Sequence, residues 1–293
     1  MEKLFDSDLV RQRRLRAMRE AAPGADFLMR HVCEDLAERL STVERRFELA
    51  ADLFSSSALP ARALAASGKV REAVGVETDR ELLGERKGLI APPETLPFDP
   101  GSIDLAVSLL ALQEANDVPG MLIQARRALK PDGLFLAALS GQGTLAELKD
   151  SLLAAETELS GGASPRVAPF ADVREAGALL QRAGFALPVT DVEQLTVRYD
   201  SMFHLMRDLR GMGATNALAA RSRRPATRAF FGRAAEIYAE RFSDPDGRVR
   251  ATFSIIWMSG WAPHASQQQP LRPGSAKVSL ASVLGKKGEG SGR

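Results

Sequence analysis

The sequence contains a single cysteine, Cys33, so the chain forms no internal disulfide and no cysteine-rich metal site. Its three histidines, His31, His204 and His264, are far apart and lack the spacing of metal ligands. No apolar run approaches the roughly 20 residues that a membrane-spanning helix needs. Motifs for a Ser/His/Asp triad, a P-loop and a G-x-S-x-G nucleophile are also missing. These absences exclude disulfide-stabilised scaffolds and P-loop enzymes, and they predict no membrane span.

The composition is ordinary for a globular protein, with 45% hydrophobic and 26% charged residues. The formal net charge of +2 does not indicate a protein that binds nucleic acid over its whole surface. The N-terminal stretch is basic, but it contains Glu2, Asp6 and Asp8 and lacks an apolar segment. It therefore predicts neither a secretory signal nor a transit peptide. Because a single cysteine suits a reducing compartment, we expect a soluble cytoplasmic protein.

The stretch ELAADLFSSSALPARAL, residues 48–64, has the pattern of a strand, a turn and a helix. That order opens nucleotide-binding domains in which a cofactor lies close to the backbone of the first turn. Such a turn is normally rich in glycine, because glycine allows positive φ and close approach of the ligand. Here the turn reads Phe54-Ser55-Ser56-Ser57 and contains no glycine. The architecture therefore predicts a cofactor site whose usual residues are missing.

Strand and helix patterns alternate after this turn. The expected strands are short and apolar on both faces, and they cover 47–53, 72–77, 88–91, 103–110 and 134–139. Helical patterns cover 60–67, 79–84 and 118–129. The sequence LKPDG predicts a turn directly before the strand at 134–139. Strands of this kind, separated by helices, predict a parallel sheet that is covered on both sides.

The C-terminal half continues with helical patterns and two strand regions. The helices are expected at 144–160, 172–183, 202–212 and 226–242, with one or two strands within 185–199 and a last strand at 252–261. The chain then divides into N-terminal lid helices (1–45), an α/β core (46–200), a helical insertion (201–245), the last strand with its C-terminal segment (246–284) and a disordered tail (285–293).

Two local expectations concern the N-terminal helices. The side chain of Asp26 is expected to cap the helix that follows it. The arginine cluster Arg11, Arg13, Arg14 and Arg16 is expected to coat a solvated helix face, because charge runs on helices usually face water. The alternative is that the cluster binds a partner.

Ligands of parallel sheets bind at the carboxyl ends of the strands, where the strand order reverses. We expect Asp52 to end the first strand and Glu77 to end the second. A carboxylate at Glu77 can accept both ribose hydroxyls of an adenosine. Alternatively, Glu77 is a surface residue that opens a helix and interacts favourably with the helix dipole. The residue pattern alone leaves both alternatives open.

The segment PETLPFDPGSIDLAVSLLALQEANDVPGMLIQARRALKPDGLFLAAL, residues 93–139, resembles the second half of a class I S-adenosylmethionine-dependent methyltransferase domain. Over nearly its full length the chain resembles the methyltransferase-fold assembly factors of respiratory complex I, whose mitochondrial member is an arginine hydroxylase acting on a complex I subunit. The resemblance rests on LFDSDLVRQR, SLLAAETELSGGASPRVAPF, MFHLMRDLRGMGATN, and TFSIIWMSGWAPHASQQQP with GSAKVS. A more distant similarity is to the malonyl carrier-protein O-methyltransferase of biotin synthesis.

This resemblance implies a Rossmann-like class I methyltransferase fold, an α/β fold with a seven-stranded, mostly parallel sheet and a helical lid. It implies S-adenosylmethionine as the cofactor and a protein client, such as a respiratory complex I subunit, as the partner. The implied cofactor contacts are Asp52, Phe54, Ser55, Ser56, Glu77, Glu94, Leu96, Ser108 and Leu109. The implied substrate-pocket residues are Gln113, Asn116, Asp117, Asn216 and His264. No residue is indicated as a general base.

Two departures from the family pattern bear on activity. The family's D-L-G-C-G-x-G reads DLFSSSA here, so Phe54, Ser56 and Ala58 replace three glycines. A non-glycine held at positive φ costs about 1–3 kcal/mol, and the benzyl group of Phe54 is expected to intrude on the cofactor. The family's histidine–tryptophan pair after the fourth strand reads Gln113-Glu114.

Three functions are consistent with these features. The first is an S-adenosylmethionine-dependent methyltransferase acting on a protein or a small molecule. The second is a complex I assembly factor of the arginine-hydroxylase lineage. The third is a pseudoenzyme without cofactor that serves as a protein-binding module. The altered turn favours the third over the first, whereas the full-length resemblance favours the second.

Overall fold

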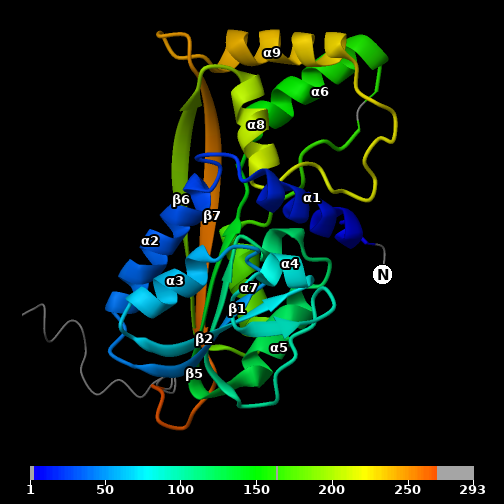
Figure 1. The fold of residues 1–293 in the computed structure, drawn as a ribbon. Helices are drawn as coiled ribbons and strands as arrows, with labels where there is room; N and C mark the ends of the chain where they lie inside the picture. Colours follow the sequence, from blue (N-terminus) through cyan, green and yellow to red (C-terminus); the bar gives the residue numbers. More distant parts are fainter. Residues whose placement is uncertain (1–2, 163, 269–293) are drawn as a thin grey trace, which may run out of the picture. The chain divides into compact units, whose positions relative to one another are not determined.

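A seven-stranded sheet organises the chain, with the strand order β3-β2-β1-β4-β5-β7-β6 (Figure 1). The computed structural model describes residues 3–162 and 164–268, so the predicted tail at 285–293 lies outside the described residues. Residues up to Pro263 form one compact unit, and a second unit begins at His264. The strands are β1 (Phe47–Leu53), β2 (Val70–Glu77), β3 (Gly88–Ile90), β4 (Ile103–Leu109), β5 (Leu129–Ser140), β6 (Ala186–Tyr199) and β7 (Val249–Trp261). The predicted seven-stranded methyltransferase-type fold is confirmed.

The first five strands are parallel, and β1 lies in the middle of them. It pairs with β2 on one side and with β4 on the other, so that Asp52 lies opposite both Gly75 and Val107. Every residue of β4 is buried, which explains its uninterrupted apolar run. The strand order therefore reverses between β1 and β4, and this reversal fixes the place where a ligand can bind.

Helices cover both faces of the sheet (Figure 1). They are α1 (Ser7–Glu20), α2 (Phe27–Ser41), α3 (Leu59–Ala66), α4 (Arg80–Leu83), the short 3-10 helix η1 (Leu112–Glu114), α5 (Val118–Ala128), α6 (Ala146–Ser160), α7 (Val173–Arg182), α8 (Met202–Gly211) and α9 (Arg228–Phe242). Residues of α2, α3, α6, α8 and α9 form one buried apolar cluster, and residues of α5 and α7 belong to the other. None of the described helices combines the length and the apolar character required to cross a membrane.

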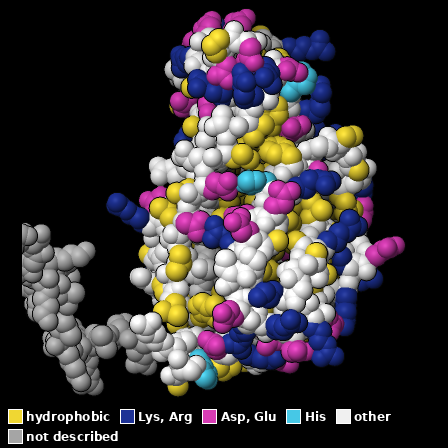
Figure 2. All heavy atoms as spheres, turned by 90° about the vertical axis from the view of Figure 1, so that its left-hand side faces the viewer, with side chains coloured by type: hydrophobic (Ala, Val, Ile, Leu, Met, Phe, Trp, Pro, Cys, Tyr) yellow, Lys and Arg dark blue, Asp and Glu magenta, His cyan; other side chains and the backbone are white. Residues whose placement is uncertain are grey.

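The strands β6 and β7 form an antiparallel pair that extends beyond the parallel strands (Figure 1). The sequence predicted one or two strands within 185–199, and the structure has one. β7 begins at Val249, earlier than expected, because Val249 pairs with Tyr199 at the far end of β6. Burial alternates along β6, as expected for a strand with one face toward solvent. On the side of the molecule shown in Figure 2, basic and acidic side chains are interspersed among hydrophobic ones.

Two local predictions need correction. Asp26 is the N-cap residue of α2, but its side chain makes no capping hydrogen bond and instead forms an ion pair with Arg30 at 2.6 Å. The LKPDG segment does not form a separate turn, because β5 already begins at Leu129. Asp132 does take a left-handed φ of 63°, and the pairing of β4 with β5 shifts register at this point.

Candidate functional site

The turn after β1 lies at the reversal of strand order and keeps the shape of a glycine turn without containing glycine. Phe54 has φ 58° and Ser56 has φ 54°, both in the left-handed region that favours glycine. Two hydrogen bonds hold this backbone, from Phe54 N to the carbonyl of Val76 at 2.9 Å and from Ser56 N to Glu77 Oε1 at 2.6 Å. Ala58 has φ −84°, so its position needs no glycine. Only two of the three replaced glycines therefore lie at strained positions.

The side chain of Phe54 does not line the large cavity of this site. It is only 6% exposed and belongs to the buried cluster that also contains Val76, Leu96 and Met121. The benzyl group therefore packs in the core. It also borders a small pocket of about 60 Å³ together with Thr78 and other residues. Burial of this aromatic ring helps to offset the backbone strain at the same residue.

Asp52, next to the last residue of β1, and Glu77, the last residue of β2, are almost completely buried, with 0% and 1% exposure. Between them lies the guanidinium of Arg86, from the segment that joins α4 to β3. Its Nη1 is 2.9 Å from Asp52 Oδ2 and its Nη2 is 3.0 Å from Glu77 Oε1. Arg86 also donates to the carbonyls of Leu82 and Leu83, at 2.8 and 3.1 Å. The three charged groups form an internal network in which the guanidinium is the counter-ion of both carboxylates.

The electrostatics of this network are unbalanced at Asp52. Burial raises the pKa of Asp52 to about 7, although Arg86 and the hydroxyl of Ser55 act in the opposite direction. Ser55 Oγ donates to Asp52 Oδ2 at 2.8 Å, while Asp52 Oδ1 is buried without a hydrogen-bond partner. Burial is the main cause of the raised pKa, and the negative charge of Glu77 adds to it.

Helix α1 lies across the carboxyl end of the sheet and is held there by its arginines, so the prediction of a solvated face is wrong for most of the cluster. Arg11 pairs with Asp79 at 2.9 Å, and Arg14 pairs with Glu114 at 2.6 Å. Arg13 donates to the carbonyl of Thr215. Only the Arg16 pair, with Glu20 on the same helix, is mainly exposed. The sequence could not reveal this arrangement, because the acidic partners come from distant segments.

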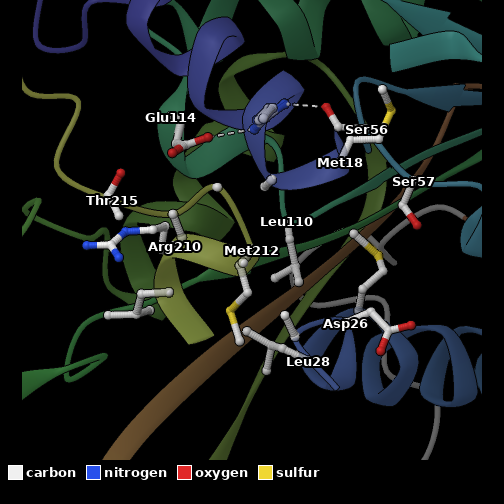
Figure 3. Close-up of a pocket in the computed structure, with 18 of the residues that line it drawn as sticks. Met18, Asp26, Leu28, Ser56, Ser57, Leu110, Glu114, Arg210, Met212 and Thr215 are labelled. Carbon is white, nitrogen blue, oxygen red and sulfur yellow. Dashed lines mark hydrogen bonds and ion pairs between the residues drawn. The ribbon is translucent and has the colours of Figure 1, made fainter. Parts of the chain in front are cut away.

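Arg14 links the turn after β1 to the segment after β4. Its Nη1 donates to the carbonyl of Phe54 at 3.0 Å and to Ser56 Oγ at 3.2 Å, and its Nη2 contacts Glu114 Oε2. Figure 3 shows Ser56 and Glu114, the acceptors of these bonds, each at the end of a dashed line. The side chains of Arg14 and Glu114 are only 15% and 17% exposed. These acceptors form a receptor for a guanidinium group, which the chain's own Arg14 fills.

A cavity of about 1240 Å³ opens in front of these groups. Its walls come from α1, the start of α2, the turn after β1, the segment 81–86 and the region of α8 with the loop that follows it. Met18, Leu28, Leu110 and Met212 give it an apolar lining (Figure 3). The volume exceeds the 300–1,000 Å³ typical of small-molecule sites, so there is room for more than one small ligand.

The structure brings several predicted residues together at this cavity. Ser55 and Ser56 line it, and Asp52 and Glu77 lie behind them in the Arg86 network. Gln113 lines the cavity and donates to the carbonyl of Leu110 at 2.8 Å, while its Oε1 is buried without a partner. Asn216 also lines the cavity, with its amide bound to the carbonyl of Pro165 at 2.8 Å.

The other predicted residues do not line the large cavity; they bind nearby parts of the chain or lie in the core. The carboxylate of Glu94 accepts hydrogen bonds from Asn116 N at 2.6 Å and from Asp117 N at 3.1 Å. Asn116 binds the backbone of Phe5, and Asp117 caps α5. Leu96, Ser108 and Leu109 are buried in the core and do not line the large cavity. His264 is exposed and binds Ser266 and Gln267 in its own unit.

Sequence analysis missed the two arginines that organise the site. Two buried carboxylates at adjacent strand ends require a counter-ion, so the existence of a basic partner could have been predicted. Its identity could not, because Arg80, Arg86 and Lys87 all follow Glu77 closely. Within the described part of the chain, no group of three or more His, Cys, Asp or Glu is arranged to hold a metal ion. Burial raises the pKa of the Cys33 thiol to about 12, which disfavours a reactive thiolate.

Comparison with known proteins relates this geometry to two groups of relatives. A sequence family described as a methyltransferase domain matches residues 52–137. The human protein named arginine-hydroxylase NDUFAF5, mitochondrial, is 39% identical over 287 residues, covering 96% of this chain and 83% of the human protein. A malonyl-[acyl-carrier protein] O-methyltransferase of Laribacter hongkongensis is 33% identical, covering 85% of this chain and 88% of that protein. The crystal structure of the YcgJ protein of Bacillus subtilis matches with a TM-score of 0.54 at 18% identity, covering 79% of this chain and 99% of YcgJ.

The methyltransferase domain supports S-adenosylmethionine as the cofactor. The turn after β1 fits, because Phe54 and Ser56 hold the positive φ of a glycine turn and Phe54 does not fill the large cavity. Glu77 lies at the end of β2, where a carboxylate can accept ribose hydroxyls. In this structure, however, Glu77 is bound by Arg86 and Ser56 N and does not line the cavity.

Proposed function

Because the chain belongs to the family of the arginine hydroxylase NDUFAF5 and carries a methyltransferase domain, we propose that it binds an arginine-bearing segment of a protein client in the large cavity. A respiratory complex I subunit, the partner that the sequence resemblance implies, is the first candidate client. The proposal also requires that the chain is located in the same compartment as its client. The relatives are named mitochondrial, and the cytoplasmic location expected from the sequence stays a prediction.

The observation that carries the proposal is the receptor filled by Arg14. The carbonyl of Phe54, the hydroxyl of Ser56 and the carboxylate of Glu114 accept hydrogen bonds from one guanidinium in a partly buried place. A client arginine that displaces Arg14 meets the same three acceptors. Planar guanidinium groups are recognised best by such fixed, charge-assisted acceptors, which a lysine ammonium does not match. Helix α1 then acts as the lid that its own arginine holds closed.

The test uses peptides that span the subunits of respiratory complex I, each offered with its arginines intact and with every arginine replaced by lysine. The full chain is expected to bind a subset of the arginine peptides and to lose that binding with lysine. Glu114→Gln should weaken arginine-dependent binding at least tenfold. Glu20→Gln is the matched control, since Glu20 pairs with an arginine of α1 on the exposed side. Binding that ignores the exchange of arginine for lysine would contradict the proposal.

A second function, S-adenosylmethionine-dependent methyl transfer, is favoured by the glycine-like turn and the domain match at 52–137. The bound cofactor would supply an electrophilic methyl group. Ser55 and Ser56 would face it from the turn, and Glu77 would receive its ribose. Transfer would form a bond from the methyl group to an acceptor nucleophile, break the methyl–sulfur bond, and leave S-adenosylhomocysteine and a proton. Incubation with methyl-labelled cofactor and the bound peptides tests this function, and absence of labelled peptide would count against it.

A further inference from the structure

The side chain of Arg86 is mostly buried and held by hydrogen bonds, unlike that of an ordinary surface arginine. The Arg86 side chain is 11% exposed, and all of its donor nitrogens face acceptors: two carboxylates, two carbonyls and, at 3.5 Å, the hydroxyl of Ser55. The guanidinium lies beside residue 75 of β2, which is glycine. A Cβ at this position would lie 3.5 Å from Arg86 Nη1 and 2.9 Å from the side chain of Leu83. The fold therefore holds this arginine against the strand ends.

The guanidinium of Arg86 is bound to Glu77, the carboxylate that would bind the ribose of a nucleoside. Glu77 ends β2 beside the reversal of strand order, the position from which a carboxylate binds ribose hydroxyls. Glu77 Oε1 already accepts from Arg86 and from Ser56 N. With 1% exposure, Glu77 has no surface left for a ligand.

The side chain of Arg86 lies next to open space. It lines the large cavity, as do its neighbours from Glu81 to Glu85, so the side chain can swing outward into open space. Its segment joins the four-residue helix α4 to β3 and contains Gly84 at φ 62°.

We propose that Arg86 is an internal occupant of the nucleoside site and must leave Glu77 before the adenosine part of S-adenosylmethionine can bind. Arg86 thus sets the affinity and specificity of the site, because the ribose hydroxyls of a ligand must replace its charge-assisted hydrogen bond to Glu77. This inference goes beyond client recognition and holds whichever client binds, since it concerns only the end of β2.

The test is calorimetric titration of the full chain with S-adenosylhomocysteine. Arg86→Ala combined with Asp52→Asn removes the occupant and one buried charge, so the net charge is unchanged and Glu77 remains. This double variant is expected to bind at least tenfold more tightly than the wild-type chain. Adding Glu77→Gln should abolish the gain. The matched control is Arg71→Ala combined with Glu48→Gln, an exposed arginine–carboxylate pair at the opposite ends of β2 and β1, which should bind like the wild type.

Equal affinity of the wild-type chain and the folded double variant overturns the proposal, and so does a gain that survives Glu77→Gln. If circular dichroism shows that the double variant does not fold, Arg86→Lys replaces it. Lysine keeps the charge but presents a compact ammonium that cannot bridge both carboxylates. A measurable gain in affinity for Arg86→Lys supports the proposal, and unchanged affinity overturns it. The peptide-binding test is unaffected by either result, so the two proposals can fail separately.

Discussion

At the scale of single residues, Phe54 and Ser56 hold a backbone shape that usually selects glycine. Each position is compensated by its own contacts: the ring of Phe54 is buried in the core, and the amide of Ser56 is bound to Glu77. The loss of glycines therefore did not unfold the turn. Restoring glycine at Phe54 would remove a buried aromatic side chain, so we expect it to destabilise the protein rather than repair a cofactor site.

Asp52 gives a pH-dependent prediction. An aspartate in an unfolded chain titrates near pH 3.9, whereas burial raises the pKa of Asp52 to about 7. The folded chain therefore binds the extra proton between about pH 4 and pH 7, and the contribution of Asp52 to stability falls as pH rises through this range. Asparagine does not titrate. The free energy of unfolding of Asp52→Asn, relative to wild type, should thus increase from pH 5 to pH 8.

Urea denaturation at both pH values measures this difference. The raised pKa of Cys33 keeps that nearby thiol protonated, so it does not titrate in the window. Glu77 is the remaining acidic neighbour, and its negative charge also raises the pKa of Asp52. A relative stability that is constant or decreases with pH would show that Asp52 does not carry a raised pKa.

At the scale of elements, α1 is held mainly by polar contacts. Only Leu15 and Ala17 of this helix are buried, while its arginines reach Asp79, Glu81 and Glu114 on the sheet side. A helix with so little apolar burial relies on its ion pairs for position. The partly buried Arg14 pair is expected to matter more than the exposed ones, because water and salt screen exposed pairs.

Arg14→Met should therefore release α1 without unfolding the sheet. We expect amide hydrogen exchange to become at least fivefold faster across residues 7–20, with unchanged protection in β4 and β5. Arg16→Met is the matched control, since the side chain of Arg16 is 69% exposed and pairs only within the helix. Equal acceleration in both variants, or loss of protection in the sheet, would refute the role assigned to Arg14.

At the scale of the described part of the molecule, β7 connects the parallel sheet to the helices around α9. It pairs with β5 on one side and β6 on the other, and it extends beyond β5 toward the region of α8 and α9 (Figure 1). Trp257 lies in its buried middle with 1% exposure, below the guanidinium of Arg39 at 4.4 Å. The large cavity depends on this strand, because Phe253 forms part of its wall.

Trp257→Ala is expected to lower the free energy of unfolding by about 3–5 kcal/mol, the usual loss for a buried aromatic truncated to alanine. Urea denaturation followed by circular dichroism measures it. Phe203→Ala serves as the control, since Phe203 is 49% exposed and should change stability by less than about 0.5 kcal/mol. A loss below about 1 kcal/mol for Trp257→Ala would mean that the strand does not anchor the helices.

Local patterns were sufficient to predict most of the elements. The apolar run of β1 and the alternation of β6 are local signals, and the strands formed where these signals lay. The capping role predicted for the Asp26 side chain was wrong. A carboxylate at this position can bind either a helix amide or a nearby arginine, and here it binds Arg30. Glu94, one of the implied cofactor contacts, binds Asn116 N and Asp117 N, an arrangement that depends on how two loops meet.

The parallel sheet, the glycine-free turn and the position of Asp52 and Glu77 near adjacent strand ends could be predicted from residue order, since they follow from periodicity and from the pairing of neighbouring strands. The partners of those carboxylates could not, because they depend on the three-dimensional packing. Arg86 and Arg14 reach the site from a connecting segment and from α1, and which arginine meets which carboxylate depends on how segments pack in three dimensions. The energy of a buried charge depends on all of its neighbours at once, so it cannot be read from the order of residues.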